Sequence, residues 1–313
     1  MNLIIKGLLT ALLLATTAVA SAGHDIQVYT ADNSKGKITG ATIEKAFEAA
    51  GFFISGHNDM NVAFKGKFQT TNHKMYRLMT LYKKDLATEL IKVSPRAALF
   101  TPLSMSIYMN KDSNNISVSS LSVDGMAKIT GIPATNKHMI AYGELVKATL
   151  AKALPNGKFE KLAYQPVKAV GELVSTFSFD MEGTDAEAIE EELEGIQTEM
   201  EGSLETVGFV IAGFNKLSDD FEEVGFDKYD FFDAYSICKL PVIFQVAKKT
   251  PEAGALAPCT FYMYKEKGSE TVTMEYPSVY NWLSSLSIKD EASLDVLKAA
   301  QKIMVQVVNE TIE

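Results

Sequence analysis

The sequence contains few cysteines, few arginines and a single tryptophan. Its only two cysteines are Cys238 and Cys259, and Arg77 and Arg96 are the only arginines among its 30 basic residues. The cysteines are too far apart for a Cys-x-x-Cys redox turn or for the paired spacing of a zinc ribbon. The shortage of arginine and the net charge of −9 argue against binding to nucleic acid or to anionic lipid.

The sequence also lacks the local signatures of common enzyme classes. It contains no G-x-S-x-G, H-E-x-x-H or G-x-G-x-x-G pattern and no Walker lysine loop. All four histidines lie in the first half of the chain, away from the cysteines, so a Cys–His nucleophile would need distant segments to meet. These absences favour a non-enzymatic protein without deciding the question.

Residues 1–22 have the pattern of a secretory signal. A positively charged residue, Lys6, precedes an apolar stretch, and a small-x-small cleavage site ends at Ala22. An uncleaved anchor is the alternative, but the apolar stretch is short for a membrane span and no charged stop-transfer flank follows it. The sequence therefore predicts an exported protein, periplasmic or secreted, with no membrane span after cleavage.

The rest of the chain, about 290 residues, is long enough for two domains with their own cores. One pattern occurs in it twice at a nearly constant spacing: Gly51-Phe52 corresponds to Gly208-Phe209, and Pro102 corresponds to Pro258. In each copy we expect a helix, two strands, a short helix, a hairpin and a closing helix in the same order. Because the match stays in register over about 90 residues, the sequence predicts an internal duplication.

The duplication defines the expected domains. The first repeat covers residues 23–156, a linker covers 157–173, and the second repeat covers 174–313. An acidic helix is expected to begin near Thr184 in the second repeat, and its glutamates are interpreted as a solvated face rather than as a cation-binding strip.

The second repeat resembles the domain of unknown function 302 family. In that family a cysteine element ends one strand, and a Leu-Pro-Cys-Asn element opens a later hairpin after a short helix. The matching residues here are Cys238-Lys239-Leu240-Pro241, Leu256-Ala257-Pro258-Cys259-Thr260, Met263-Tyr264-Lys265-Glu266 and Thr271-Val272-Thr273. Lys239 and Thr260 stand where the family has asparagine. The first repeat matches the family in outline only.

The resemblance implies the fold. It implies an α+β protein in which each repeat is a small antiparallel sheet with helices packed on one face. Because members of the family look dimeric, it also implies that the two repeats form an intramolecular pseudo-dimer. It implies no established reaction, and it leaves open a homo-oligomer of the whole chain.

Cys238 and Cys259 are the first candidate site. They correspond to Tyr82 and Leu103 in the first repeat, so both cysteines belong to the second repeat alone. A disulfide is one interpretation in an oxidising compartment. A thiol pair that cycles or binds a soft metal is another. Two unpaired cysteines that pack as small hydrophobic residues are the third.

A second candidate is a group of possible copper ligands in the first repeat, formed by His57, Met60, His73 and Met75. Imidazole and thioether groups suit copper in an exported protein. Their spacing matches no established motif, however, and ordinary loop residues are the alternative. We therefore assign no metal site from the sequence.

A third candidate is a ligand pocket lined by Tyr235, Tyr280 and Trp282 in the second repeat. Aromatic side chains with a polar end suit such a pocket, and packing between sheet and helices is the alternative.

Together these features favour an exported binding or accessory protein whose partner is a small molecule or another envelope protein. The alternatives are a thiol-based redox or soft-metal protein that uses Cys238 and Cys259, and a structural partner in an envelope complex. The sequence identifies no cofactor, ligand or pathway.

Overall fold

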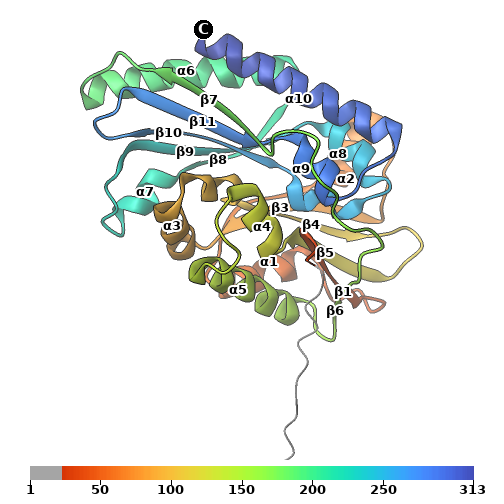
Figure 1. The fold of residues 1–313 in the computed structure, drawn as a ribbon. Helices are drawn as coiled ribbons and strands as arrows, with labels where there is room; N and C mark the ends of the chain where they lie inside the picture. The colour runs from red at the N-terminus through yellow and green to blue at the C-terminus, as the bar shows by residue number, and fades with distance from the viewer. Residues whose placement is uncertain (1–22) are drawn as a thin grey trace, which may run out of the picture.

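The computed structural model describes residues 23–313, so the predicted secretory signal lies outside the described residues. The chain forms two stacked units whose sheets lie inside and whose long helices lie outside (Figure 1). Within residues 23–313, no helix combines the length and the apolar character needed to cross a membrane.

The first repeat is built around an antiparallel sheet with the strand order β2-β3-β4-β5-β1-β6. Its last strand, β6, falls in the segment expected to be a linker and pairs with β1. The elements are β1 (Ile26–Asp32), α1 (Gly40–Ala49), β2 (Phe53–Asp59), α2 (Met60–Phe68), β3 (Met75–Tyr82), α3 (Lys84–Val93), the 3-10 helix η1 (Pro95–Phe100), β4 (Leu103–Met109), β5 (Asn115–Leu121), α4 (Val123–Thr130), α5 (Lys137–Ala153) and β6 (Lys158–Phe159).

Apart from β6, which has no counterpart, the second repeat has the same elements in the same order. Its sheet, β7-β11-β10-β9-β8, repeats the order β1-β5-β4-β3-β2 of the first repeat. The elements are β7 (Val174–Asp180), α6 (Ala186–Thr206), β8 (Val210–Lys216), α7 (Leu217–Glu222), β9 (Tyr229–Cys238), α8 (Leu240–Ala247), the 3-10 helix η2 (Pro251–Leu256), β10 (Cys259–Glu266), β11 (Thr271–Pro277), α9 (Val279–Ser285) and α10 (Glu291–Ile312).

The repeats also agree in local backbone detail. Gly51 and Gly208, which end the first helix of each repeat, have φ angles of 83° and 82°. These angles lie in the left-handed region that glycine adopts without steric cost. The next strand of each repeat has a bulge at the corresponding place, before Gly56 and before Gly213. The expected tandem duplication of an antiparallel α+β domain is confirmed.

Helices α2 and α7 were not expected, because the segment containing α2 has the polar composition of a loop. Asp59 caps α2 by accepting a hydrogen bond from the backbone N–H of Asn61. Only Met60 and Phe64 of α2 are buried, and two apolar residues one turn apart are too short a pattern to predict a helix.

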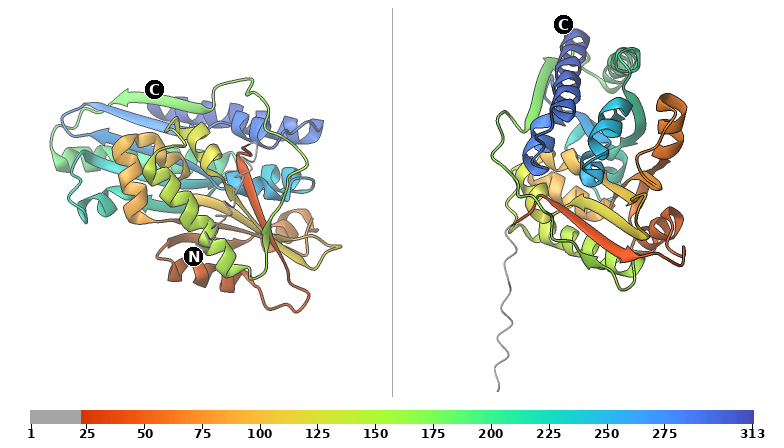
Figure 2. Two further views of the ribbon diagram at one scale, coloured as in Figure 1. Left: turned by 60° about the horizontal axis from the view of Figure 1, so that its bottom comes forward. Right: turned by 90° about the vertical axis from the view of Figure 1, so that its right-hand side faces the viewer.

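Each sheet has an outer face covered by its own helices. In the first repeat Ile43 and Phe47 of α1 and Tyr142 of α5 are fully buried. In the second repeat α6 and α10 run side by side over the sheet (Figure 2). Their apolar residues Met200 and Val308 are buried in that core. Apolar side chains recurring every three or four residues give these helices one buried face.

The inner faces of the sheets are covered reciprocally. Helix η1 of the first repeat packs on β10 and β11, and η2 of the second repeat packs on β4 and β5. Ser104 donates a hydrogen bond of 2.7 Å to the carbonyl of Pro258, and the corresponding Thr260 donates one of 3.3 Å to the carbonyl of Pro102. Such exchanged contacts are those of an interface with twofold symmetry, so the repeats form an intramolecular pseudo-dimer.

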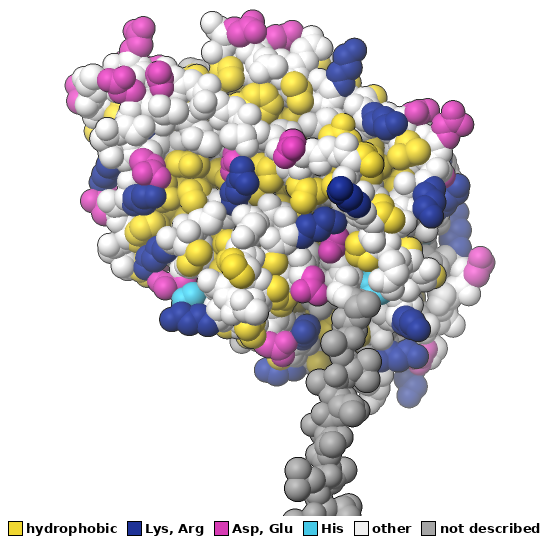
Figure 3. Space-filling model, viewed as in Figure 1, with side chains coloured by type: hydrophobic (Ala, Val, Ile, Leu, Met, Phe, Trp, Pro, Cys, Tyr) yellow, Lys and Arg dark blue, Asp and Glu magenta, His cyan; other side chains and the backbone are white. Residues whose placement is uncertain are grey.

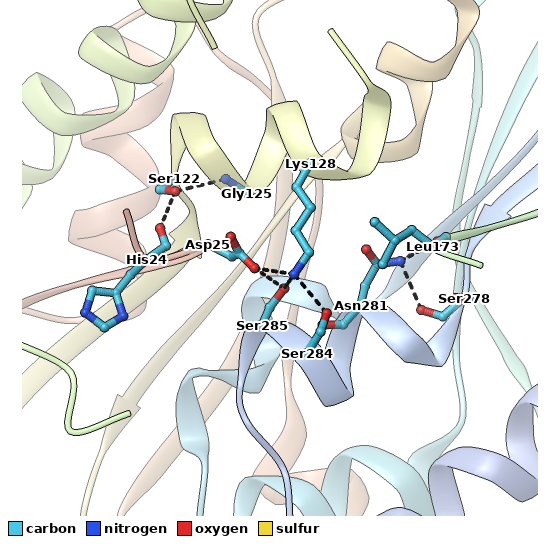
Figure 4. A network of polar contacts seen from close by, with 10 residues as sticks. All are labelled: His24, Asp25, Ser122, Gly125, Lys128, Leu173, Ser278, Asn281, Ser284 and Ser285. Carbon is cyan, nitrogen blue, oxygen red and sulfur yellow. Dashed lines mark hydrogen bonds and ion pairs between the residues drawn. The ribbon is translucent and has the colours of Figure 1, made fainter. Parts of the chain in front are cut away.

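A buried polar network also joins the repeats (Figure 4). Lys128 Nζ on α4 lies 2.5 Å from Asp25 Oδ2 and 2.8 Å from Ser284 Oγ on α9. Ser285 donates a hydrogen bond of 2.7 Å to the same carboxylate oxygen. Asp25 is only 6% exposed, so these partners take the place of water around its carboxylate.

We expect the substitution Lys128→Met to destabilise the protein by about 3 kcal/mol, because it leaves the Asp25 carboxylate buried without a cation. Urea unfolding followed by circular dichroism measures this loss.

The matched control is Lys147→Met. Lys147 pairs with Glu144 at 3.0 Å on the exposed side of α5, and its removal should cost about 0.5 kcal/mol at most. Equal losses in the two variants would contradict the role given to the buried network.

Candidate functional site

An apolar pocket lies in the second repeat, between the ends of β9 and β10 and the helices α8, α9 and α10. We call it the Trp282 pocket, and its lining includes Cys238, Cys259, Trp282, Phe209 and Met304. Its volume is about 60 Å³. By this measure one water needs about 10–15 Å³, so the pocket has room for about four to six waters or for a small ligand.

Helix α10 forms one wall of the pocket. Leu297, Ala300 and Met304 line it from this helix. Their spacing of three and four residues places them on one helical face. Trp282, from α9, is 3% exposed and is the only tryptophan of the chain. Its indole therefore lies in the pocket wall, where its fluorescence would report on occupancy.

The pocket lining contains few polar groups. Gln301 is committed to the structure, because its Oε1 accepts from the backbone N–H of Val279 at 3.0 Å and its Nε2 donates to Ser175 Oγ at 2.9 Å. Lys239 donates a hydrogen bond to the carbonyl of Val207, and its Nζ lies 4.5 Å from the centre of the Phe209 ring. Lys239 is thus the cation of this pocket.

The two cysteines are not bonded to each other. Cys259 on β10 lies opposite Ile237 on β9, so its register differs from that of Cys238 by one residue. Successive side chains of a strand point to opposite faces, which explains why neighbouring strand ends do not bring the thiols together. The disulfide that the sequence left open is therefore not formed.

Both thiols are held in the protonated form. Burial raises the pKa of Cys238 to about 12, and electrostatic repulsion from Cys259 adds to the effect. Burial also raises the pKa of Cys259 to about 11. A hydrogen bond with Trp282 acts in the opposite direction and is the smaller effect. The Cys259 thiol donates to the carbonyl of Leu256 at 3.3 Å. Since the thiolate is the nucleophile and the metal ligand, these cysteines behave as small hydrophobic residues.

We expect both thiols to be free and to react slowly in the folded protein. Ellman's reagent should find two thiols per chain after unfolding without a reductant. At pH 8 the native protein should react about 100-fold more slowly than the unfolded chain, because so little thiolate is present. Detection of no thiols after unfolding would instead reveal a disulfide.

The first repeat shows what fills the corresponding space. Tyr142 on α5 is fully buried. Its ring centre lies 6.0 Å from that of Phe52, the counterpart of Phe209, and its hydroxyl lies near the backbone of Lys83, the counterpart of Lys239. Helices α5 and α10 begin after the capping residues Asn136 and Asp290, and this alignment places the smaller Val296 at the position of Tyr142. The sequence contains this difference, but the two helices align only once their caps are known.

The three aromatic residues predicted to line a ligand pocket are not brought together. Trp282 lines the pocket described here. Tyr235 is buried in the outer core of the second repeat, where it contacts Phe214 at a ring distance of 4.7 Å. Tyr280 is half-buried, and its ring packs against Gly171 of the connecting segment.

His57 is engaged on both ring nitrogens. Its Nδ1 contacts the Glu44 carboxylate, and its Nε2 accepts a hydrogen bond of 2.9 Å from Arg77 Nε. A metal ion would have to displace one of these partners.

His73 is also engaged on both ring nitrogens. Its Nδ1 lies 3.0 Å from Asn110 Oδ1, and its Nε2 lies 2.8 Å from the carbonyl of Ala247 at the end of α8. Burial lowers the pKa of His73. Met60 is the buried first residue of α2, and Met75 is half-buried at the start of β3. In the part of the chain that the structure describes, no three His, Cys, Asp or Glu side chains form a metal-binding group.

The molecular surface carries charges of both signs, and acidic side chains gather at the end of the molecule where α6 lies (Figure 3). Glu187, Glu190 and Glu191 are exposed near the beginning of this helix. An exposed run of glutamates is a solvated surface, and it contributes nothing to the Trp282 pocket.

Comparison with known proteins identifies a family for part of the chain. Residues 33–155 match the model described as domain of unknown function DUF302. The crystal structure of an uncharacterised conserved DUF302 protein from Bacillus stearothermophilus aligns with 46% of this chain and 100% of its own, at 16% identity and a TM-score of 0.37. None of the curated proteins matches the chain.

The family suggested by the sequence is thereby confirmed, but the match covers the first repeat, where the resemblance was in outline only. The second repeat, which contains the motif residues around Cys238 and Cys259, has no match of its own. Loss of the family's asparagines at Lys239 and Thr260 fits a second repeat that has diverged further. The first repeat of this chain belongs to the DUF302 family.

Proposed function

We propose that the protein binds a small, largely apolar ligand in the Trp282 pocket and that it does so without catalysis. The observation that carries this proposal is the difference between the repeats. The first repeat fills the corresponding space with Tyr142. In the second repeat the smaller Val296 stands at the aligned position of α10, and the neighbouring Leu297 and Ala300 of that helix line an open pocket.

The energetics of an unfilled pocket support a ligand. An empty cavity of about 60 Å³ costs about 1.4 kcal/mol of stability at 24 cal/mol per Å³. Its lining is almost entirely apolar, and the half-buried amide of Gln301 already has its partners. A ligand that brings apolar surface to Trp282 and Met304 would recover this free energy by burying surface on both partners.

The chemistry of the cysteines argues against the thiol-based alternative. The pKa values of about 12 for Cys238 and about 11 for Cys259 leave almost no thiolate at neutral pH. Catalytic and redox cysteines instead have lowered pKa values. We therefore regard both thiols as part of the apolar pocket wall.

Filling the pocket with the residues of the first repeat should abolish binding. In the variant Cys259→Leu, Val296→Tyr, a thermal-shift screen with hexan-1-ol, toluene and indole should show no stabilisation. The parent protein should be stabilised by at least one of these compounds, because mass action favours the liganded state.

The matched control is Cys259→Ser, Val296→Thr, which keeps the size of both side chains. This variant should retain the response of the parent protein. If the size-matched variant lost binding while the filled variant kept it, pocket shape would not be the determinant. If no compound stabilised the parent, the binding proposal would fail.

We further propose that the mature protein is exported and works in the periplasm or outside the cell, with no nucleic acid as partner. The support is the signal-like pattern of residues 1–22 and the scarcity of arginine. N-terminal sequencing of the protein from an envelope or culture fraction should begin at Gly23. A chain that retains Met1 and remains with cytosolic proteins would contradict export.

A further inference from the structure

We infer that the ligand of the Trp282 pocket carries an anionic group, a carboxylate in the simplest case, at the end that meets Lys239. This inference rests on the proposed binding function and names the chemical class of the ligand. The first repeat pairs Lys83 with a carboxylate of its own, and the second repeat provides no such carboxylate for Lys239.

The first repeat contains the contact that we propose for the ligand. Lys83, the counterpart of Lys239, lies between β3 and α3, and its Nζ is 2.9 Å from Asp85 Oδ1 in the first turn of α3. The counterpart of Asp85 in the second repeat is Pro241, which carries no charge. Among residues 23–313, Lys239 therefore has no carboxylate within ion-pair distance.

Lys239 still has hydrogen-bonding capacity. An ammonium group has three donors. The interactions of Lys239 are one hydrogen bond to the carbonyl of Val207 and the contact with the Phe209 ring. The remaining N–H groups are available to an acceptor at the pocket.

Two positive groups lie near Lys239. Burial lowers the pKa of Lys239, and the charge of Lys67 on α2 lowers it further. Helix α8 begins directly after Lys239 without a side-chain cap and without an acidic residue in its first turn. The positive end of its dipole therefore faces the same place. The carbonyl of Val207 at the end of α6 offsets part of this repulsion, and an anion here would supply the full negative charge that Asp85 supplies to Lys83.

The volume of the pocket limits the size of the apolar part of the ligand. Space for about four to six waters corresponds to a chain or ring of about six carbon atoms. With the anion at Lys239, such a group would extend between Cys259, Trp282 and Met304. A short-chain carboxylate has this combination of a charged end and an apolar body.

Titration of Trp282 fluorescence with sodium hexanoate and with hexan-1-ol at pH 7.5 tests the inference. The two probes have the same carbon chain and differ in charge. We expect hexanoate to bind the parent protein about tenfold more tightly, since a hydrogen bond between charged groups is worth more than a neutral one. In Lys239→Met the two probes should bind about equally.

Lys83→Met is the matched control, because it removes the corresponding lysine of the first repeat and should keep the tenfold preference. Equal binding of the probes to the parent would overturn the anionic ligand and leave the apolar pocket standing. A preference unchanged in Lys239→Met would also overturn it, by placing the anion elsewhere. If neither probe bound, the proposed function itself would fail.

Discussion

The structure depends on the reciprocal covering of the two sheets. Each sheet has an inner face that its own helices do not cover, and the 3-10 helix of the other repeat packs there. The hydrogen bonds from Ser104 and Thr260 to the opposite repeat fix this arrangement. A repeat folded alone would expose this face to water, with the loss of its buried surface. The two repeats are therefore one folding unit, in which each completes the core of the other.

Joining two copies in one chain allows the two halves of the interface to differ. Arg96 on η1 forms a 3.0 Å ion pair with Glu275 on β11. The counterpart of Arg96 is Glu252 on η2, whose pKa is raised by burial, and the counterpart of Glu275 is Ser119, which donates to the carbonyl of Glu252 at 3.0 Å. A dimer of identical chains would contain two equal contacts here. The Trp282 pocket and the unpaired Lys239 are further differences of this kind.

Sequence patterns accounted for most of the fold and for little of the site. The duplication was readable because Gly51 and Gly208 are required at the same left-handed turn. Helices α2 and α7 were missed because each buries only two or three side chains. Of the candidate site residues, Trp282 and the two cysteines line one pocket. Tyr235 and the histidines make unrelated contacts, since sequence proximity says nothing about which face a side chain occupies.

The sequence by itself determined the repeat, because hydrophobic periodicity and obligatory glycines act locally along the chain. Its motif residues carried the resemblance that implied the α+β class and the family. Only the tertiary structure decided that the cysteines are not bonded and that a pocket opens between α10 and the ends of β9 and β10. It also decided that Lys239 lacks the carboxylate that Lys83 has in Asp85. These properties depend on the volume left between elements far apart in sequence and on the register of β9 against β10. Neither quantity is contained in any single segment.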